Sequence, residues 1–218
     1  MEYASYELTH SDLSPCTVWL GDASTPVWRQ ARWSAGEYQE FVRKNGCGHC
    51  CAAMALNLHH VKIDPHEEFT LCRALWGEPV REREFPQGNY QTVSGIAKIL
   101  RYHGVRAEWC GVPTREIAAA RIADALQSGK QVIFWSNPNE DFPENPFSLG
   151  EHYVMAVGHA ENGKILVANS SERRAPDGVH LVDIDVIARA LFLGAEPDDL
   201  TWGEKGNHHR CAGYVVVG

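Results

Sequence analysis

The spacing of apolar residues changes near residue 130, and this change constrains the fold more than any other feature of the sequence. Before it, apolar side chains recur every three or four residues, as at Val93, Ile96 and Leu100, which is the period of an amphipathic helix. After it, short apolar runs such as 131–135 are separated by turn residues, which is typical of strands. The sequence therefore predicts an α+β fold, with a helical first half packed on an antiparallel sheet formed by the second half.

The strongest local signal is a hairpin. Two apolar segments, 152–159 and 164–168, flank Ala160-Glu161-Asn162-Gly163, in which Asn-Gly favours a tight reversal. Capping residues and glycines bound the other elements. We expect helices at 34–44, 47–58, 64–76, 92–103, 114–128 and 185–193, and strands at 16–20, 27–33, 105–110, 131–135, 179–182 and 211–217. A length of 218 residues fits one domain.

Composition excludes several kinds of partner. The net charge is −8 and the 20 lysines and arginines are scattered, which argues against nucleic-acid binding. The sequence starts without a basic and apolar leader, and no apolar run approaches the roughly 20 residues that span a bilayer. We therefore expect a cytoplasmic protein without a membrane segment. Seven cysteines, an odd number with three of them inside 47–51, argue against a disulfide framework.

One cysteine stands where a thiol can become reactive. Asn45-Gly46 is a turn signal, and the run that follows it from Cys47 to Leu58 lacks proline and β-branched residues, which predicts a buried helix. At the start of that helix, open backbone N–H groups and the helix dipole favour a thiolate at Cys47. The dipole supplies about 1 kcal/mol, whereas lowering a thiol pKa from about 8.5 to about 4 takes about 6 kcal/mol. Most of the activation must therefore come from an imidazolium partner.

The sequence contains 11 histidines, and position selects His152 among them. It opens an apolar strand after a Pro/Asn-rich loop, which makes it rigidly held yet reachable. Because the hairpin turn is centred near 161–163, Asn169 leaves the partner strand at the same end. Cross-strand neighbours lie about 5 Å apart, so the Asn169 side chain could hold the second imidazole nitrogen. The sequence thus predicts Cys47 as nucleophile, His152 as base and Asn169 as the residue that orients the base.

These residues resemble the papain-like cysteine peptidases, and most closely the bacterial bacteriocin-processing (double-glycine leader) peptidases in a stand-alone form. The resemblance rests on Gly46-Cys47-Gly48 leading into an Ala/Met/Leu helix, on Gly-x-His-Tyr-Val-x-x-Val-Gly at 150–158, and on Asn169 after the next strand. It covers 39–171, so 1–35 would be an N-terminal extension and 172–218 a C-terminal elaboration of one domain, 1–218. It implies a papain-like fold and hydrolysis of peptide bonds through a thioester acyl-enzyme, with no cofactor and no metal.

The same resemblance suggests where substrate would bind. The family carries a Gln before the nucleophile, whose amide supports the oxyanion; Gln39 is the candidate here, and Asn45 is a closer substitute. The substrate would be a peptide or protein, held by loops 78–90 and 137–150, with Tyr90, Trp135 and Phe147 lining its pocket. No transporter segment accompanies the motifs, so the leader-peptide substrate of the family is not carried over.

Other functions stay open on the sequence alone. The same three residues could serve an acyltransferase or an amidase. Cys47-Gly48-His49-Cys50 is also the active-site motif of disulfide isomerases, although a segment of helical period precedes it where those proteins have a strand. A zinc site could join Cys47 and Cys50 to His208, His209 or Cys211. If Cys47 and His152 were out of reach of each other, the chain would be a non-catalytic peptide-binding module.

Overall fold

A computed structural model of the chain describes residues 46–76, 92–136, 142–150, 152–160, 163–171, 173–175, 178–191 and 213–218. It also describes the backbone of 2–3, 6–7, 16–20 and 23–27.

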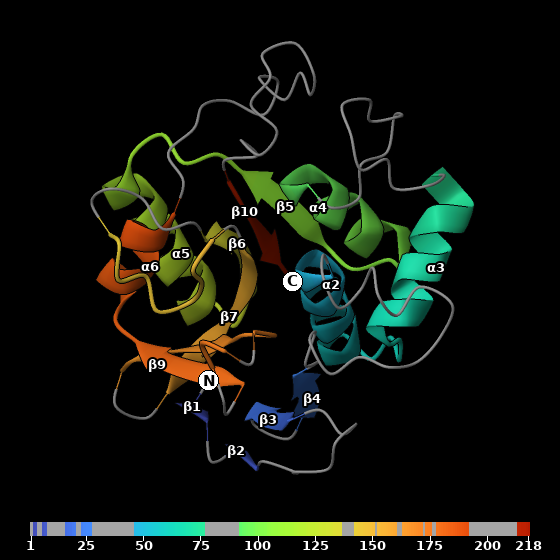
Figure 1. The fold of residues 1–218 in the computed structure, drawn as a ribbon, viewed down its shortest axis with the longest axis horizontal. Helices are drawn as coiled ribbons and strands as arrows, with labels where there is room; N and C mark the ends of the chain where they lie inside the picture. Colours follow the sequence, from blue (N-terminus) through green and yellow to red (C-terminus); the bar gives the residue numbers. More distant parts are fainter. Residues whose placement is uncertain are drawn as a thin grey trace.

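The centre of the molecule is a sheet in which six strands follow one another in the order β5-β10-β6-β7-β8-β9 (Figure 1). These six strands are antiparallel to their neighbours, and β1 (Glu2–Tyr3) pairs in parallel with β7. Their bounds are β5 (Ala107–Cys110), β6 (Gln131–Ser136), β7 (His152–Ala160), β8 (Ile165–Ala168), β9 (Val179–Val182) and β10 (Tyr214–Val217). With the helices that cover it, this sheet confirms the predicted α+β class.

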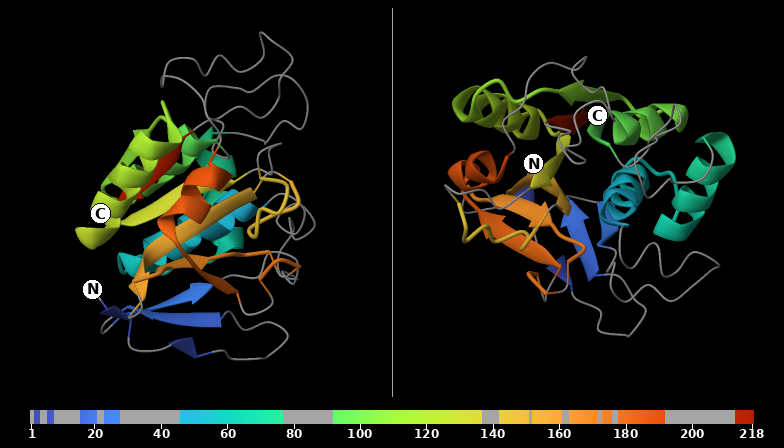
Figure 2. Two further views of the ribbon diagram at one scale, coloured as in Figure 1. Left: turned by 90° about the vertical axis from the view of Figure 1, so that its left-hand side faces the viewer. Right: turned by 45° about the horizontal axis from the view of Figure 1, so that its top comes forward.

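A second, small sheet comes from the first residues of the chain. It consists of β2 (Tyr6–Glu7), β3 (Cys16–Leu20) and β4 (Ala23–Val27), paired in that order. Figure 2 shows it in blue at one end of the molecule, where β4 contacts α2. Val27, the first residue of the strand expected at 27–33, is the last residue of β4. Residues 28–33 and the helix expected at 34–44 lie outside the described residues.

The helices that the structure describes are α2 (Cys47–Leu58), α3 (Pro65–Trp76), α4 (Val93–Tyr102), α5 (Arg115–Gln127) and α6 (Ile184–Ala190). Side-chain caps mark the start of three of the helices, α3, α4 and α5. Thr92 Oγ1 accepts the Gly95 N–H at 2.9 Å, and Thr114 Oγ1 accepts the Ile117 N–H at 3.3 Å, so each threonine satisfies an N–H of the first turn. Asp64 Oδ1 does the same for α3, accepting the N–H groups of His66 and Glu67 at 2.8 Å.

The middle of the central sheet, where β6, β7 and β8 lie, is buried on both faces. Along β6, Ile133 and Trp135 pack with α2, α3 and α4, whereas Val132 and Phe134 pack with α5 and α6. Because successive strand residues point to opposite faces, a strand covered on both sides is apolar at nearly every position. Figure 1 shows the two groups of helices on either side of the sheet.

The C-terminal strand has a structural role that the sequence prediction did not assign to it. The family resemblance implies that 172–218 is an elaboration of the domain. Within this segment, β10 pairs with β5 on one side and with β6 on the other. β9 adds the strand beyond β8. Both strands therefore complete the sheet that carries β7 and β8.

Candidate active site

Cys47 is the first residue of α2. The N-cap residue, Gly46, has no side chain to cap the helix, and the first turn contains no acidic residue. The positive end of the helix dipole is therefore not neutralised by α2 itself. Cys47 is partly exposed and packs at the margin of the core cluster that α2 shares with the sheet. A thiol in this position is reachable and lies in a field that favours its thiolate.

The neighbouring thiols are in a different environment. Cys50 and Cys51 are buried, and burial raises the pKa values of both thiols well above their ordinary value. A negative charge on Cys47 raises both pKa values further. Burial likewise raises the pKa of Cys72 and Cys110. Since the thiolate is the nucleophilic form, burial disfavours reactivity at these four cysteines.

His152 and Asn169 are joined by a hydrogen bond. His152 is the first residue of β7 and Asn169 directly follows β8, and Asn169 Oδ1 lies 2.8 Å from His152 Nε2. Both residues are buried, with exposed fractions of 7% and 0%. Among the described residues, the His152 side chain makes this hydrogen bond and no other.

Two backbone groups fix which way the Asn169 amide points. The Ser171 N–H donates to Asn169 Oδ1 at 2.8 Å, and Asn169 Nδ2 donates to the Phe147 carbonyl at 3.0 Å. Rotating the amide by half a turn would place donor against donor and acceptor against acceptor. Asn169 Oδ1 must therefore accept the His152 Nε2–H, which leaves Nδ1 of the neutral imidazole as the nitrogen with a free lone pair.

The first turn of α2 lies against the ends of both strands. A Cβ added at Gly48 would meet the Tyr153 ring at 3.4 Å, so the residue after Cys47 packs on the residue after His152. On the other side, the Cys50 thiol hydrogen-bonds to the Ser170 side chain, next to Asn169. These two contacts bring the helix start, the start of β7 and the end of β8 into one region.

Burial changes the proton affinity of the imidazole. It lowers the pKa of His152 to about 4, while the hydrogen bond that His152 donates to Asn169 acts in the opposite direction. At neutral pH and beside a neutral thiol, His152 is therefore an uncharged base. Burial thus opposes the imidazolium form of His152 that was expected from the sequence.

The structure places two of the predicted pocket residues inside the protein. Trp135 is 9% exposed and packs edge-on against Tyr153 at 4.6 Å between ring centroids. Phe147 has no exposed surface, and its ring packs against Phe134. Phe147 therefore supports the site through its carbonyl and not as the wall of an open pocket. The predicted residues Gln39, Asn45 and Tyr90 lie outside the described residues.

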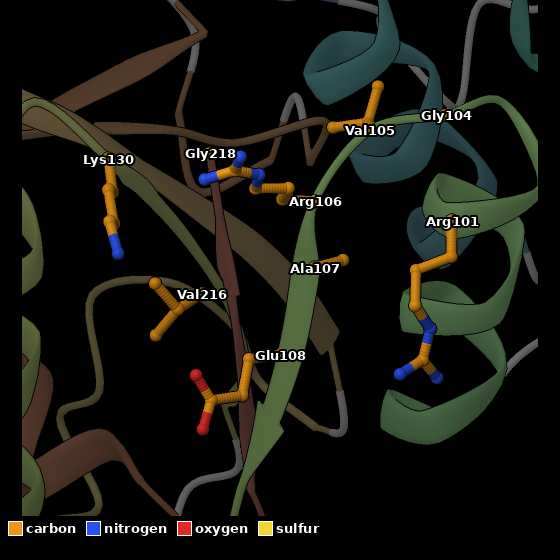
Figure 3. Close-up of a pocket in the computed structure, with 9 residues that line it drawn as sticks. All are labelled: Arg101, Gly104, Val105, Arg106, Ala107, Glu108, Lys130, Val216 and Gly218. Atoms are coloured by element: carbon orange, nitrogen blue, oxygen red, sulfur yellow. The ribbon is translucent and has the colours of Figure 1, made fainter.

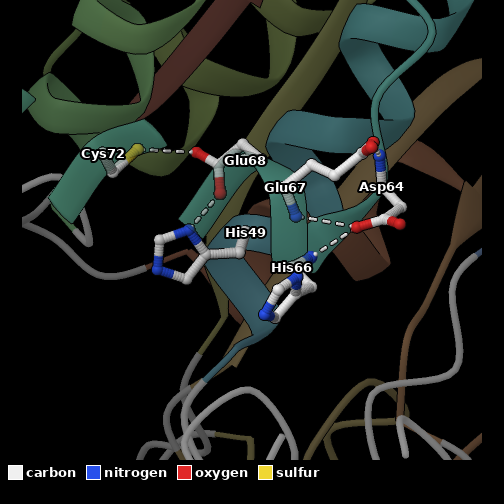
Figure 4. A network of polar contacts seen from close by, with 6 residues as sticks. All are labelled: His49, Asp64, His66, Glu67, Glu68 and Cys72. Carbon is white, nitrogen blue, oxygen red and sulfur yellow. Dashed lines mark hydrogen bonds and ion pairs between the residues drawn. The ribbon is translucent and has the colours of Figure 1, made fainter. Parts of the chain in front are cut away.

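A second polar cluster lies between α2 and α3 (Figure 4). Glu68 accepts hydrogen bonds from His49 Nδ1 and from the Cys72 thiol, the latter at 3.1 Å, and all three residues are buried. Their ligand atoms lie within 4.8 Å of one another, and their types suit zinc. His208, His209 and Cys211 of the predicted zinc site lie outside the described residues. Sequence reasoning missed this cluster, although Glu68 and Cys72 are four residues apart on one helix face.

The described surface also carries a hollow of about 470 Å³ where α4, β5 and β10 meet (Figure 3). Its charged lining consists of Arg101, Arg106, Lys130 and Glu108. None of the predicted site residues lines it, so it is separate from the Cys47 region.

Comparisons with known proteins found solved structures whose fold resembles this chain. No protein-family model and no curated protein matches the chain. A solved structure that resembles it is the crystal structure of a protein from Bacillus anthracis, provisionally assigned as a C39-like peptidase. The two share 13% sequence identity with a TM-score of 0.48, over 80% of this chain and 88% of that one. Among the described residues, no helix is long and apolar enough to cross a membrane.

Proposed function

We propose that this protein is a papain-like cysteine hydrolase that cleaves peptide bonds, with Cys47 as nucleophile, His152 as general base and acid, and Asn169 as the residue that orients His152. The observation that carries the proposal is the hydrogen bond between His152 and Asn169, whose amide orientation is fixed by two backbone groups. It leaves His152 Nδ1 as the basic nitrogen of the ring. A base held by a third group is what an activated nucleophile requires.

The reaction follows from these roles. The Cys47 sulfur attacks the peptide carbonyl carbon, and its proton moves to His152 Nδ1. His152 then gives that proton to the departing amine, the C–N bond breaks, and a thioester remains on Cys47. Water attacks the thioester, His152 takes its proton and returns it to the sulfur, and the carboxylic acid leaves. The Cys47 backbone N–H, with Gln39 or Asn45, would hold the oxyanion in both steps.

The test is the rate of alkylation at each cysteine between pH 5 and 9, read by peptide mapping. Cys110 is the matched internal control, because it is partly exposed like Cys47 and has no imidazole among the groups that shift its pKa. We expect Cys47 to react at least about tenfold faster than Cys110 at pH 7, a factor that needs only about 1.4 kcal/mol. In His152→Ala the rate at Cys47 should fall by about tenfold, whereas the rate at Cys110 should stay unchanged. Equal rates at Cys47 and Cys110 in the wild-type protein would overturn the proposal.

The acceptor of the acyl group needs a separate assay. Wild-type protein is incubated with a mixture of peptides, and new termini are read by mass spectrometry with Cys47→Ser as the control. New carboxyl termini that depend on Cys47 support a peptidase. Peptide amides formed with added amines, in place of free acids, would identify an acyltransferase. Exchange with a small disulfide that needs both Cys47 and Cys50 would instead support the oxidoreductase alternative.

A further inference from the structure

The Asn169 side chain uses all of its hydrogen-bonding positions. A carboxamide oxygen has two lone pairs and its nitrogen has two protons. Oδ1 accepts from Ser171 N–H and from His152, and Nδ2 donates to the Phe147 carbonyl. The second proton of Nδ2 faces His180 Nε2 at 3.0 Å. A second histidine therefore completes the set of contacts that holds the orienting residue.

His180 is placed by the sheet itself. It lies on β9 opposite Val167 of β8, so it is a diagonal neighbour of Asn169, two residues further along the chain from Val167. Its ring also packs edge-on against Phe147, with 5.3 Å between centroids and 87° between planes. The Phe147 carbonyl and the Phe147 ring thus contact the Asn169 amide and the His180 imidazole, respectively.

Hydrogen-bond polarity fixes the state that His180 must have. Asn169 Nδ2 can only donate, so His180 Nε2 must carry a lone pair and the proton of the neutral ring must be on Nδ1. Burial, followed by the charges of His152 and Arg174, lowers the pKa of His180 to about 4, which keeps the ring neutral near pH 7. The Phe147 carbonyl and Ser171 N–H are backbone groups with a fixed polarity. Among the partners of the Asn169 side chain, His180 is therefore the one that a substitution can remove while Asn169 and His152 themselves stay unchanged.

We propose that His180 is a positioning residue, whose Nε2 accepts a hydrogen bond from Asn169 and thereby holds Asn169 Oδ1 on His152 Nε2–H, with His152 Nδ1 left as the base for Cys47. This inference rests on the proposed function. It extends the site by one residue, from the strand that follows the hairpin.

Three variants at β9 test it through the alkylation rate of Cys47 and the unfolding temperature. His180→Phe keeps a ring to pack on Phe147 and removes the acceptor; His180→Gln keeps an acceptor near the position of Nε2. Leu181→Gln is the control, because Leu181 is 41% exposed and adjacent to His180 on the same strand. We expect His180→Phe to slow alkylation of Cys47 at pH 7 by about tenfold, and His180→Gln and Leu181→Gln to stay within about threefold of wild type.

A purely structural role for His180 would lower the unfolding temperature of His180→Phe and leave the pH profile of Cys47 alkylation unchanged, and this result would overturn the inference. His152→Ala, run alongside, separates the two failures. If it reacts like wild type, the proposed function is wrong, and the inference fails with it. If it loses reactivity while His180→Phe does not, only the inference is wrong.

A measurement on the wild-type protein covers the case in which His180→Phe does not fold. Long-range proton–nitrogen NMR spectra of the imidazoles report which ring nitrogen carries the proton. We expect the Nε2–H tautomer at His152 and the Nδ1–H tautomer at His180 near pH 7. An Nε2–H tautomer at His180 cannot accept from Asn169 and would overturn the inference directly.

Discussion

Replacing Asn169 with leucine removes the hydrogen bonds at the centre of the site while keeping the number and branching of the side-chain heavy atoms. Asn169 is fully buried, so a leucine there would keep water out of the space that the amide now fills. Four groups would lose their partner: the Ser171 N–H, the Phe147 carbonyl, His152 Nε2 and His180 Nε2. An alanine would be less informative, because a water molecule could take the place of the amide.

The size of the effect follows from which of these groups can reach solvent. Ser171 and His180 are half-buried and can find water, whereas Phe147 and His152 are buried. Each buried polar group left without a partner costs about 1–3 kcal/mol, so the two together cost about 2–6 kcal/mol. For a chain of this size each kcal/mol lowers Tm by roughly 2–4 °C, which makes the expected drop roughly 8–16 °C at the middle of that range.

Urea unfolding and thermal scans of Asn169→Leu measure this cost. Lys164→Met is the matched control, because it breaks an ion pair with Asp183 at 3.1 Å in which both side chains are exposed. Such pairs contribute about 0–1 kcal/mol, so the control should stay close to wild type. A loss below about 1 kcal/mol in Asn169→Leu would show that the four contacts do not form together, and the reasoning about the amide orientation would fail with it.

Three further predictions concern the backbone, pH and metals. At Gly213 (φ +139°) an added Cβ would lie 2.5 Å from Trp109 Nε1, so Gly213→Ala should lose at least about 2 kcal/mol of stability in urea unfolding. Gly48→Ala is the control: its added Cβ has its nearest contact at 3.4 Å, and its stability should stay within about 1 kcal/mol of wild type. Similar urea midpoints for the two variants would contradict this. The folded-state pKa of His152, about 4, is below its ordinary 6.5, so the unfolded chain binds the proton first as pH falls. The contribution of His152 to the free energy of unfolding is intact above about pH 6.5 and falls by about 3 kcal/mol by about pH 4. His152→Gln should lack this fall. An equal pH dependence of the free energy of unfolding in the two proteins, measured with urea, would refute the prediction. A chelator should leave Cys47 alkylation unchanged, and a loss that zinc restores would favour a zinc-dependent site.

Much of the local structure could be predicted from the sequence, because the signals act over a few residues. The threonine caps at 92 and 114 and the Asp64-Pro65 start set the beginnings of three helices. Gly163 takes the positive φ of +77° that a glycine after Asn favours, which closes the hairpin between β7 and β8. Since the hairpin sets which residues share one end, the proximity of His152 and Asn169 could be inferred as well.

Other features depend on which strands pair, and only the tertiary structure decides that. Nothing near residue 214 indicates that Tyr214 pairs with both Cys110 and Phe134, or that β9 brings His180 beside Asn169. The contact of His49 with Glu68 likewise needs α3 to fold back on α2. Capping and turn preferences are short-range and therefore readable in the sequence. Pairing between distant strands and helices is selected by burial of the whole core, to which every apolar residue contributes and no single motif is specific.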